Sequence, residues 1–160
     1  LEHRGTLTNT WIVYSADHGE MLGEHRLWAK MNFYNGAVQV PLIIRPPAGT
    51  TSREIDSLVE LTDVTATLAA IAGAGSPGMC SGTSLLGALD DEPVGRDHVR
   101  SRINRFTAVR AGRYRFTMDV ETGTACELFD LEEDPGERTN MVNDRGRAQV
   151  IDGLRALVAA

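Results

Sequence analysis

The stretch "WIVYSADHGEMLGEHRLWAK", residues 11–30, joins an apolar run to a segment rich in ionisable side chains. Residues Thr10 to Ala16 are mostly β-branched, aromatic or apolar, which predicts a fully buried strand of the kind found in parallel sheets. Residues 17–30 are polar and contain two glycines, which indicates a long loop. Ligands of open α/β sheets bind beyond the carboxyl ends of strands, so this loop is the first candidate for a functional site.

Two potential metal ligands follow the strand directly. Asp17 and His18 can both reach one cation, provided that the strand has ended, because neighbours inside a strand point to opposite faces. Carboxylate oxygens favour hard cations such as calcium or magnesium, and a histidine also admits manganese or zinc. Two ligands are too few for a tight site, so others must come from elsewhere. Taken alone, the pair is better explained by an aspartate that caps a turn and a histidine bonded to the backbone.

The only lysine of the chain lies in the same loop. Lys30 is the single lysine among 16 basic residues, the others being arginine. A lysine carries a compact point charge, whereas arginine presents a rigid planar fork. A site that needs one ammonium beside a tetrahedral anion would therefore use lysine, although chance placement explains the composition equally well.

Further elements follow this loop. Asn32 to Gln39 is predicted to hold one helical turn, and Val40 to Arg45 a second buried strand that the following prolines stop. Ile55 to Leu61 is predicted to be a third strand, and residues 76–82 form a loop rich in Gly, Ser and Pro. "SLLGAL", residues 84–89, is at most a short helix.

The segment "TDVTATLAAIAGAG", residues 62–75, predicts a helix. Thr62 or Asp63 would cap its first turn, and Gly73 would end it. The inward face would consist of Val64, Leu68 and Ile71.

The last third of the chain changes pattern. From Asp97 onward, short segments of partial alternation are separated by glycine or polar turns, which predicts an antiparallel meander. "DPGERTN", residues 134–140, is interpreted as a turn rather than a cation-binding loop. Arg147 to Ala159 predicts an amphipathic helix. Its apolar face would contain Val150, Leu154, Leu157 and Val158.

These elements predict an α/β fold. Parallel-type strands and a helix would be followed by a small antiparallel sheet that packs with the C-terminal helix. We assign residues 1–90 to the α/β part and residues 91–160 to the antiparallel part.

Composition narrows the functional classes. The chain has 160 residues and a net charge of −6, and the acidic balance argues against a general nucleic-acid binder. No apolar run is long enough to cross a membrane. Cys80 and Cys126 form neither a metal-ligand spacing nor a redox pair, which favours two separate thiols.

Several motifs, taken in order, resemble the sulfatase family of the alkaline-phosphatase-like superfamily. They are "YSADHGEMLGEHRLWAKMNFYNGAVQVPLIIRPP", "LVELTDVTATLAAIAG", "GTSLLGAL", "AVRAGRYRF" and "ELFDLEEDPGERTNMV". The resemblance covers nearly the whole chain. It implies the fold of that family and hydrolysis of a sulfate ester by a formylglycine hydrate.

The resemblance also implies roles for single residues. Asp17 and His18 match two metal ligands of the family, in which many members have Asn at the second position and the cation is usually calcium. Lys30 matches the lysine that contacts the sulfate and the nucleophile, and His25 would line the substrate pocket. The implied partner is a sulfate ester, on a small molecule or a sugar.

The sequence also departs from the family pattern. Sulfatases carry their nucleophile in a Cys-or-Ser, x, Pro, Ser-or-Ala, Arg motif, and neither "GMCSGTS" nor "TACELFD" fits it. We therefore expect the C-terminal portion of a sulfatase-like enzyme, inactive alone, with the formylglycine in a missing N-terminal part. Two alternatives remain: a phosphonate monoester or phosphodiester hydrolase of the same superfamily, and a non-catalytic interaction module. Exposed strand edges would also favour a homo-oligomer.

Overall fold

The computed structural model describes residues 1–47, 49, 52–75, 78, 80–90, 92–93 and 96–159. The chain forms two compact units, Leu1–Ile55 and Asp56–Ala160. The predicted division between residues 90 and 91, with residues 1–90 as part of a sulfatase core, stays a prediction. Three residues of the predicted loop at 76–82, namely Ser76, Pro77 and Met79, lie outside the described residues.

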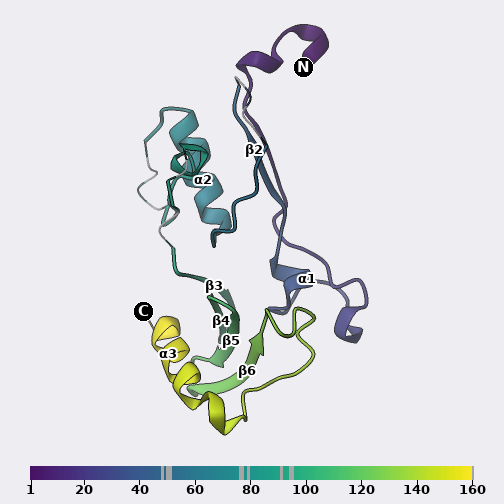
Figure 1. Ribbon diagram of the computed structural model, residues 1–160, viewed down its shortest axis with the longest axis vertical. Helices are drawn as coiled ribbons and strands as arrows, with labels where there is room; N and C mark the ends of the chain where they lie inside the picture. Colours follow the sequence, from purple (N-terminus) through teal and green to yellow (C-terminus); the bar gives the residue numbers. More distant parts are fainter. Residues whose placement is uncertain are drawn as a thin grey trace. The chain divides into compact units, whose positions relative to one another are not determined.

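The first unit is built on a two-stranded ladder. Strands β1 (Ile12–Ser15) and β2 (Leu42–Arg45) pair antiparallel, with Ser15 opposite Leu42 (Figure 1). The prediction of parallel-type strands is therefore wrong for this pair. An apolar run reports burial but not direction, and a parallel pair needs a crossover, usually a long helix. The connection here contains only the single turn α1 (Asn35–Val38) and a short 3₁₀ turn, η3 (Glu24–Arg26).

The ladder is only partly covered in this structure. Tyr14 and Ile43 are register partners, and each is 59% exposed. The prediction of fully buried strands is thus corrected, while the predicted loop and the predicted helical turn after it are confirmed. Two more 3₁₀ turns, η1 (Glu2–Arg4) and η2 (Leu7–Asn9), precede β1.

The second unit begins with helix α2 (Leu61–Ile71). Residues 52–60 have no regular secondary structure, so the predicted strand at Ile55 to Leu61 is absent. Glu60 caps the helix, in a capping box where the Glu60 N–H donates to Asp63 Oδ2 at 2.8 Å. The predicted cap was therefore placed two or three residues too late. The predicted end is confirmed, with Gly73 at φ 66°.

Two of the three buried residues of α2 are polar. Asp63, Ala66 and Thr67 are buried, whereas Leu68, predicted to face inward, is 48% exposed. The reason lies in the segment before the 3₁₀ turn η4 (Gly87–Asp90), whose backbone N–H groups bond to side chains of the helix. The Thr83 N–H donates to Asp63 Oδ1, and the Leu85 N–H to Thr67 Oγ1, each at 2.8 Å.

A four-stranded antiparallel meander follows, as predicted. Its strands lie in chain order: β3 (His98–Ile103), β4 (Phe106–Ala111), β5 (Tyr114–Asp119) and β6 (Thr124–Asp130). The turns use left-handed residues, with φ 52° at Gly112 and 69° at Gly123. The β5–β6 register shifts between Thr117 and Met118, which marks a bulge.

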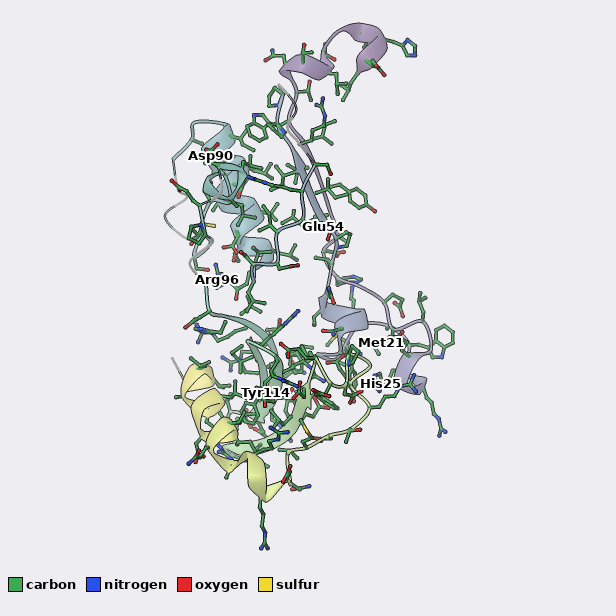
Figure 2. The ribbon with its side chains drawn as sticks, in the orientation of Figure 1. Met21, His25, Glu54, Asp90, Arg96 and Tyr114 are labelled. Atoms are coloured by element: carbon green, nitrogen blue, oxygen red, sulfur yellow. The ribbon has the colours of Figure 1, made fainter. Side chains whose placement is uncertain are left out.

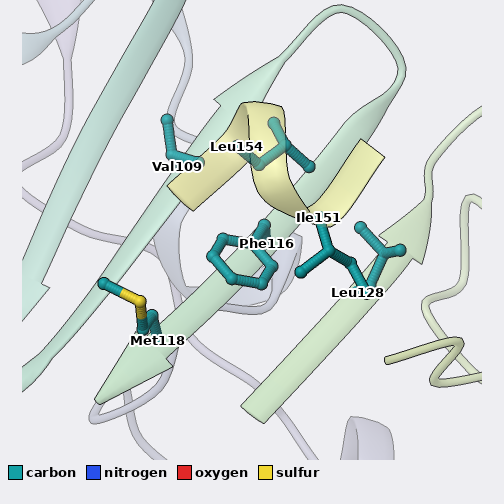
Figure 3. Close-up of a cluster of buried hydrophobic side chains, with 6 residues drawn as sticks. All are labelled: Val109, Phe116, Met118, Leu128, Ile151 and Leu154. Atoms are coloured by element: carbon teal, nitrogen blue, oxygen red, sulfur yellow. The ribbon is translucent and has the colours of Figure 1, made fainter. Parts of the chain in front are cut away.

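The C-terminal helix α3 (Ala148–Ala159) packs on this sheet. The shared core consists of Val109, Phe116, Met118, Leu128, Ile151 and Leu154 (Figure 3). Burial of each large apolar side chain contributes about 1.5–3 kcal/mol, so this core is the main stabilising feature of the second unit. The predicted amphipathic helix is confirmed, although its predicted face omitted Ile151. Among the described residues, no helix has the length and apolar character needed to span a membrane.

Candidate functional site

The residues after β1 form a local hydrogen-bonded arrangement. The backbone N–H of His18 donates to Asp17 Oδ1 at 3.0 Å, and His18 Nδ1 lies 2.7 Å from the carbonyl oxygen of Gly19. A carbonyl oxygen can only accept a hydrogen bond, so Nδ1 carries the proton. In the neutral imidazole, His18 Nε2 then keeps its lone pair and can accept a hydrogen bond or bind a metal.

Three of the sequence-predicted site residues come together here. The Lys30 ammonium contacts His18 Nε2, and Asp17 Oδ2 lies 3.5 Å from the same nitrogen. The side chain of Asp17 is 87% exposed, so its carboxylate is accessible to a ligand. We call Asp17, His18 and Lys30 the loop cluster.

Close backbone packing fixes the loop at its base. The Gly19 N–H donates to the Ala37 carbonyl of α1 at 2.8 Å. A Cβ at Gly19 would lie 2.1 Å from the backbone oxygen of Gly36, so only glycine fits without a backbone shift. Met21 is fully buried, and its N–H donates to the Ala29 carbonyl at 3.2 Å. These contacts bring residue 30 back toward residue 18.

The loop contains unusual backbone conformations. Leu22, His25, Arg26 and Ala29 have φ between 49° and 65°, the left-handed region that side chains other than glycine rarely adopt. Such residues cost of order 1–3 kcal/mol each in sparsely populated regions and persist where surrounding contacts hold them. Here the Glu20 carboxylate accepts a hydrogen bond from the Ala29 N–H.

Glu20 is a positioning residue that sequence reasoning missed. Its carboxylate holds the backbone of the residue directly before Lys30, so it helps to place the ammonium. The only sequence signal was an acidic residue in the quoted loop, and this signal does not identify a backbone partner.

His25 lies in the same loop (Figure 2) but has a different partner. Its ring stacks on Tyr34, with ring centroids 3.9 Å apart and planes 12° apart. The structure does not bring His25 into the loop cluster, and its role in lining a substrate pocket stays a prediction.

The loop cluster offers two ligands to a cation. Asp17 Oδ2 and His18 Nε2 are adjacent oxygen and nitrogen donors, a mixed set that fits manganese or zinc, whereas calcium would be held through the carboxylate oxygen. Among the described residues, no group of three or more His, Cys, Asp or Glu side chains is placed to hold a metal. The two donors thus fit part of a divalent cation site, and other ligands would have to complete it; a cation at this place stays a prediction.

Other sequence features have structural explanations. Cys80 and Cys126 are free thiols. Asp134 accepts hydrogen bonds from the N–H groups of Arg138 and Thr139, each at 2.7 Å, which agrees with the turn predicted for residues 134–140.

A second acidic residue near that turn is held by an arginine. Asp130 Oδ1 accepts from Arg113 Nε at 2.7 Å, and this hydrogen bond holds the pKa of the Asp130 carboxyl below its usual value. Asp130 and Asp134 therefore both have structural hydrogen-bond partners, and neither is assigned to a ligand site.

Comparisons with known proteins identify the family. The family model described as "N-sulphoglucosamine sulphohydrolase, C-terminal" matches residues 23–160. Choline-sulfatase of Rhizobium meliloti (strain 1021) is 37% identical over 152 residues, covering 88% of this chain and 28% of the relative. Arylsulfatase K of Mus musculus is 32% identical over 153 residues, covering 86% and 28%.

The fold gives the same assignment. The solved phosphonate monoester hydrolase of Agrobacterium radiobacter superposes with a TM-score of 0.85 at 27% identity, covering 99% of this chain and 36% of that structure. The chain spans less than a third of the length of the curated relatives above. Its fold is thus the alkaline-phosphatase-like α/β fold, represented by a C-terminal portion. The chain belongs to the sulfatase family, in which it matches the C-terminal part described for N-sulphoglucosamine sulphohydrolase.

Proposed function

We propose that the chain supplies part of the active site of a metal-dependent sulfuric ester hydrolase. The observation that carries the proposal is the loop cluster, in which an oxygen donor, a nitrogen donor and an ammonium lie around one point. Family membership supports a hydrolase, and the cluster supports a substrate that carries an anionic tetrahedral group.

The chemistry follows from charge. When the S–O bond of a sulfate ester breaks, negative charge grows on the leaving oxygen and stays on the sulfate oxygens. The ammonium of Lys30 stabilises this charge through hydrogen bonds that strengthen toward the transition state. Asp17 and His18 would hold a divalent cation, with calcium as the first choice and manganese or zinc as alternatives. Such a cation, when bound, polarises the sulfate oxygens as a Lewis acid.

The attacking group is proposed to lie outside these 160 residues. Cys80 and Cys126 do not occur in a Cys-x-Pro-x-Arg motif, so neither is a candidate formylglycine. We therefore propose that the chain alone does not turn over substrate and that the whole protein provides the nucleophile. What this chain contributes is the Lys30 ammonium, two cation ligands and the loop that carries them.

A second candidate is a phosphonate monoester or phosphodiester hydrolase. It is favoured by the likeness to the Agrobacterium radiobacter enzyme, which covers 99% of this chain. Phosphonate and sulfate esters both present charged tetrahedral oxygens, so the loop cluster suits either. The choice between them depends on residues outside the described site.

A substrate panel tests the proposal. The whole protein is assayed with an aryl sulfate, choline sulfate, a sulfated glucosamine, an aryl phosphonate monoester and a diaryl phosphodiester, before and after chelation. We expect the highest kcat/KM for a sulfate ester, loss of activity on chelation, and recovery with calcium or manganese. A higher value for the phosphonate would favour the second candidate. No turnover of any ester would contradict an enzymatic role and favour a non-catalytic interaction module.

A further inference from the structure

We propose that Lys30 and a divalent cation compete for one lone pair on His18, so that cation binding releases Lys30 for the anionic substrate. The inference deepens the proposed function and rests on it, because it takes Asp17 and His18 as cation ligands. It adds an order of events: the cation binds before the Lys30 ammonium is available to the sulfate.

The lone pair on His18 is the first step of the argument. A neutral imidazole has one N–H and one acceptor nitrogen. Nδ1 is committed as a donor to the Gly19 carbonyl at 2.7 Å. Gly19 is itself held, because its N–H bonds to Ala37 and the backbone of Gly36 packs against it. The ring is therefore oriented with a single acceptor, Nε2, toward the loop cluster.

Lys30 uses this acceptor. Its ammonium contacts His18 Nε2, and an ammonium has three donors and no acceptor. It cannot bridge the imidazole to a cation, and a positive ion next to it would also be repelled. The Lys30–His18 hydrogen bond and a His18–cation bond are thus mutually exclusive.

The cation would need the same position. Asp17 Oδ2 lies 3.5 Å from Nε2, so a cation bound to the imidazole at Nε2 would be within reach of the carboxylate. Lys30 is exposed and has a flexible four-carbon stem, so it can leave without disturbing the backbone that Glu20 and Met21 hold. After it leaves, the Lys30 ammonium can bind the anionic group of the substrate.

A double-mutant cycle on manganese affinity tests the competition. The dissociation constant for Mn²⁺ is measured by electron paramagnetic resonance on the whole protein, for the wild type, Lys30→Met, His18→Asn and the double variant. An amide carbonyl oxygen has two lone pairs, so Asn at position 18 can accept from Lys30 and bind a cation together. The His18→Asn background therefore removes the competition and keeps the charge of Lys30.

The competition predicts that Lys30→Met changes the Mn²⁺ dissociation constant by different factors in the wild-type and His18→Asn backgrounds. Losing one hydrogen bond of ordinary net strength corresponds to a change of about two- to tenfold in affinity. Lys30→Met should tighten Mn²⁺ binding by that factor when His18 is present and by less than about twofold when Asn replaces it. The first ratio should persist at about 0.5 M salt, where repulsion between exposed charges is screened.

The other outcomes are decisive. Equal ratios of the Mn²⁺ dissociation constants in the two backgrounds would mean that Lys30 acts only through long-range charge, and this would overturn the competition. Unchanged Mn²⁺ affinity on Lys30→Met would overturn it as well. If Asp17→Ala and His18→Ala both leave Mn²⁺ affinity unchanged, the cation site itself is wrong, and the proposed function fails with it. Sensitivity to those two variants without any effect of Lys30→Met would keep the proposed function and overturn only the competition.

Discussion

The Lys30 ammonium contacts Nε2 of His18, a residue twelve positions earlier in the chain. The contact forms because the intervening loop folds back on itself, with the Met21 N–H bonded to the Ala29 carbonyl. A carboxylate, an imidazole and an ammonium are thereby gathered by one short segment.

The first prediction concerns the base of the loop. Gly19→Ala places a Cβ 2.1 Å from the Gly36 backbone oxygen, so the backbone on one side must move. We expect this variant to lose stability by more than about 1 kcal/mol and to weaken Mn²⁺ binding severalfold, because the carbonyl that orients His18 shifts. Urea unfolding and the Mn²⁺ assay measure both effects.

Gly153→Ala is the matched control for that substitution. Gly153 lies within α3, and a Cβ there meets no atom within 4 Å. Alanine at this position should raise stability by about 0.5–1 kcal/mol, with Mn²⁺ affinity unchanged. Equal behaviour of the two variants would contradict the close approach of Gly19 and Gly36.

The second prediction concerns a buried ion pair in the sheet unit. Arg115 Nε donates to Glu137 Oε1 at 2.5 Å, and both side chains are only 3% exposed. Arg115→Met leaves the Glu137 carboxylate buried without this partner, which should cost about 3–5 kcal/mol of unfolding free energy. Adding Glu137→Met should recover part of the loss, because it removes the buried carboxylate. Recovery should be incomplete, because Glu127, which pairs with Arg115 at 2.9 Å, keeps its charge and loses this partner.

The measurement is urea unfolding followed by circular dichroism. Arg138→Met, at an exposed position, should change stability by less than about 0.5 kcal/mol. The ion pair would be energetically unimportant if Arg115→Met behaved like this control.

The third prediction concerns pH. The Arg113 hydrogen bond lowers the pKa of Asp130 below its unfolded value of about 3.9. The ionised carboxylate therefore adds stability that is fully present above that unfolded value and is lost as pH falls through the lower folded value. Arg113→Gln should reduce this contribution, so the stability difference between wild type and variant should shrink from pH 6 to pH 2. A difference independent of pH would refute it.

Local sequence signals predicted the second half of the chain well. Alternating residues and the turn positions Gly112 and Gly123 act over a few residues, so the meander was recognisable. The apolar spacing of the last segment likewise predicted α3, because Leu154 and its neighbours recur on one helical face. Both signals depend on the residues themselves rather than on distant partners.

Features that depend on distant partners were not predictable in this way. The direction of β2 relative to β1 is set by the path of the connection, and an apolar run carries no such information. Thr62 and Asp63 looked like better caps than Glu60, yet Asp63 is needed inside the helix to bind the Thr83 backbone. The predicted strand before α2 lacked a pairing partner among the described residues.

The candidate site was predicted in part. Asp17, His18 and Lys30 were identified from residue type and family resemblance, and the structure brings them together. His25 was grouped with them because it lies in the same loop, but its ring stacks on Tyr34. The left-handed conformations that determine the loop path occur at residues whose sequence preference is against them, so the path could not be read from propensity.

The most direct measurement is turnover of a sulfate ester by the whole protein carrying Lys30→Ala, with Arg26→Ala as a control that removes a positive charge from the same loop. A charged donor in a preorganised site commonly contributes about a hundred- to a thousandfold in rate. We expect kcat to fall by that factor for Lys30→Ala with KM little changed, no substantial rescue by Lys30→Arg, and kcat within about twofold of wild type for Arg26→Ala. A Lys30→Ala enzyme with the same melting temperature and kcat within about twofold of wild type would contradict the assignment of this lysine to the active site.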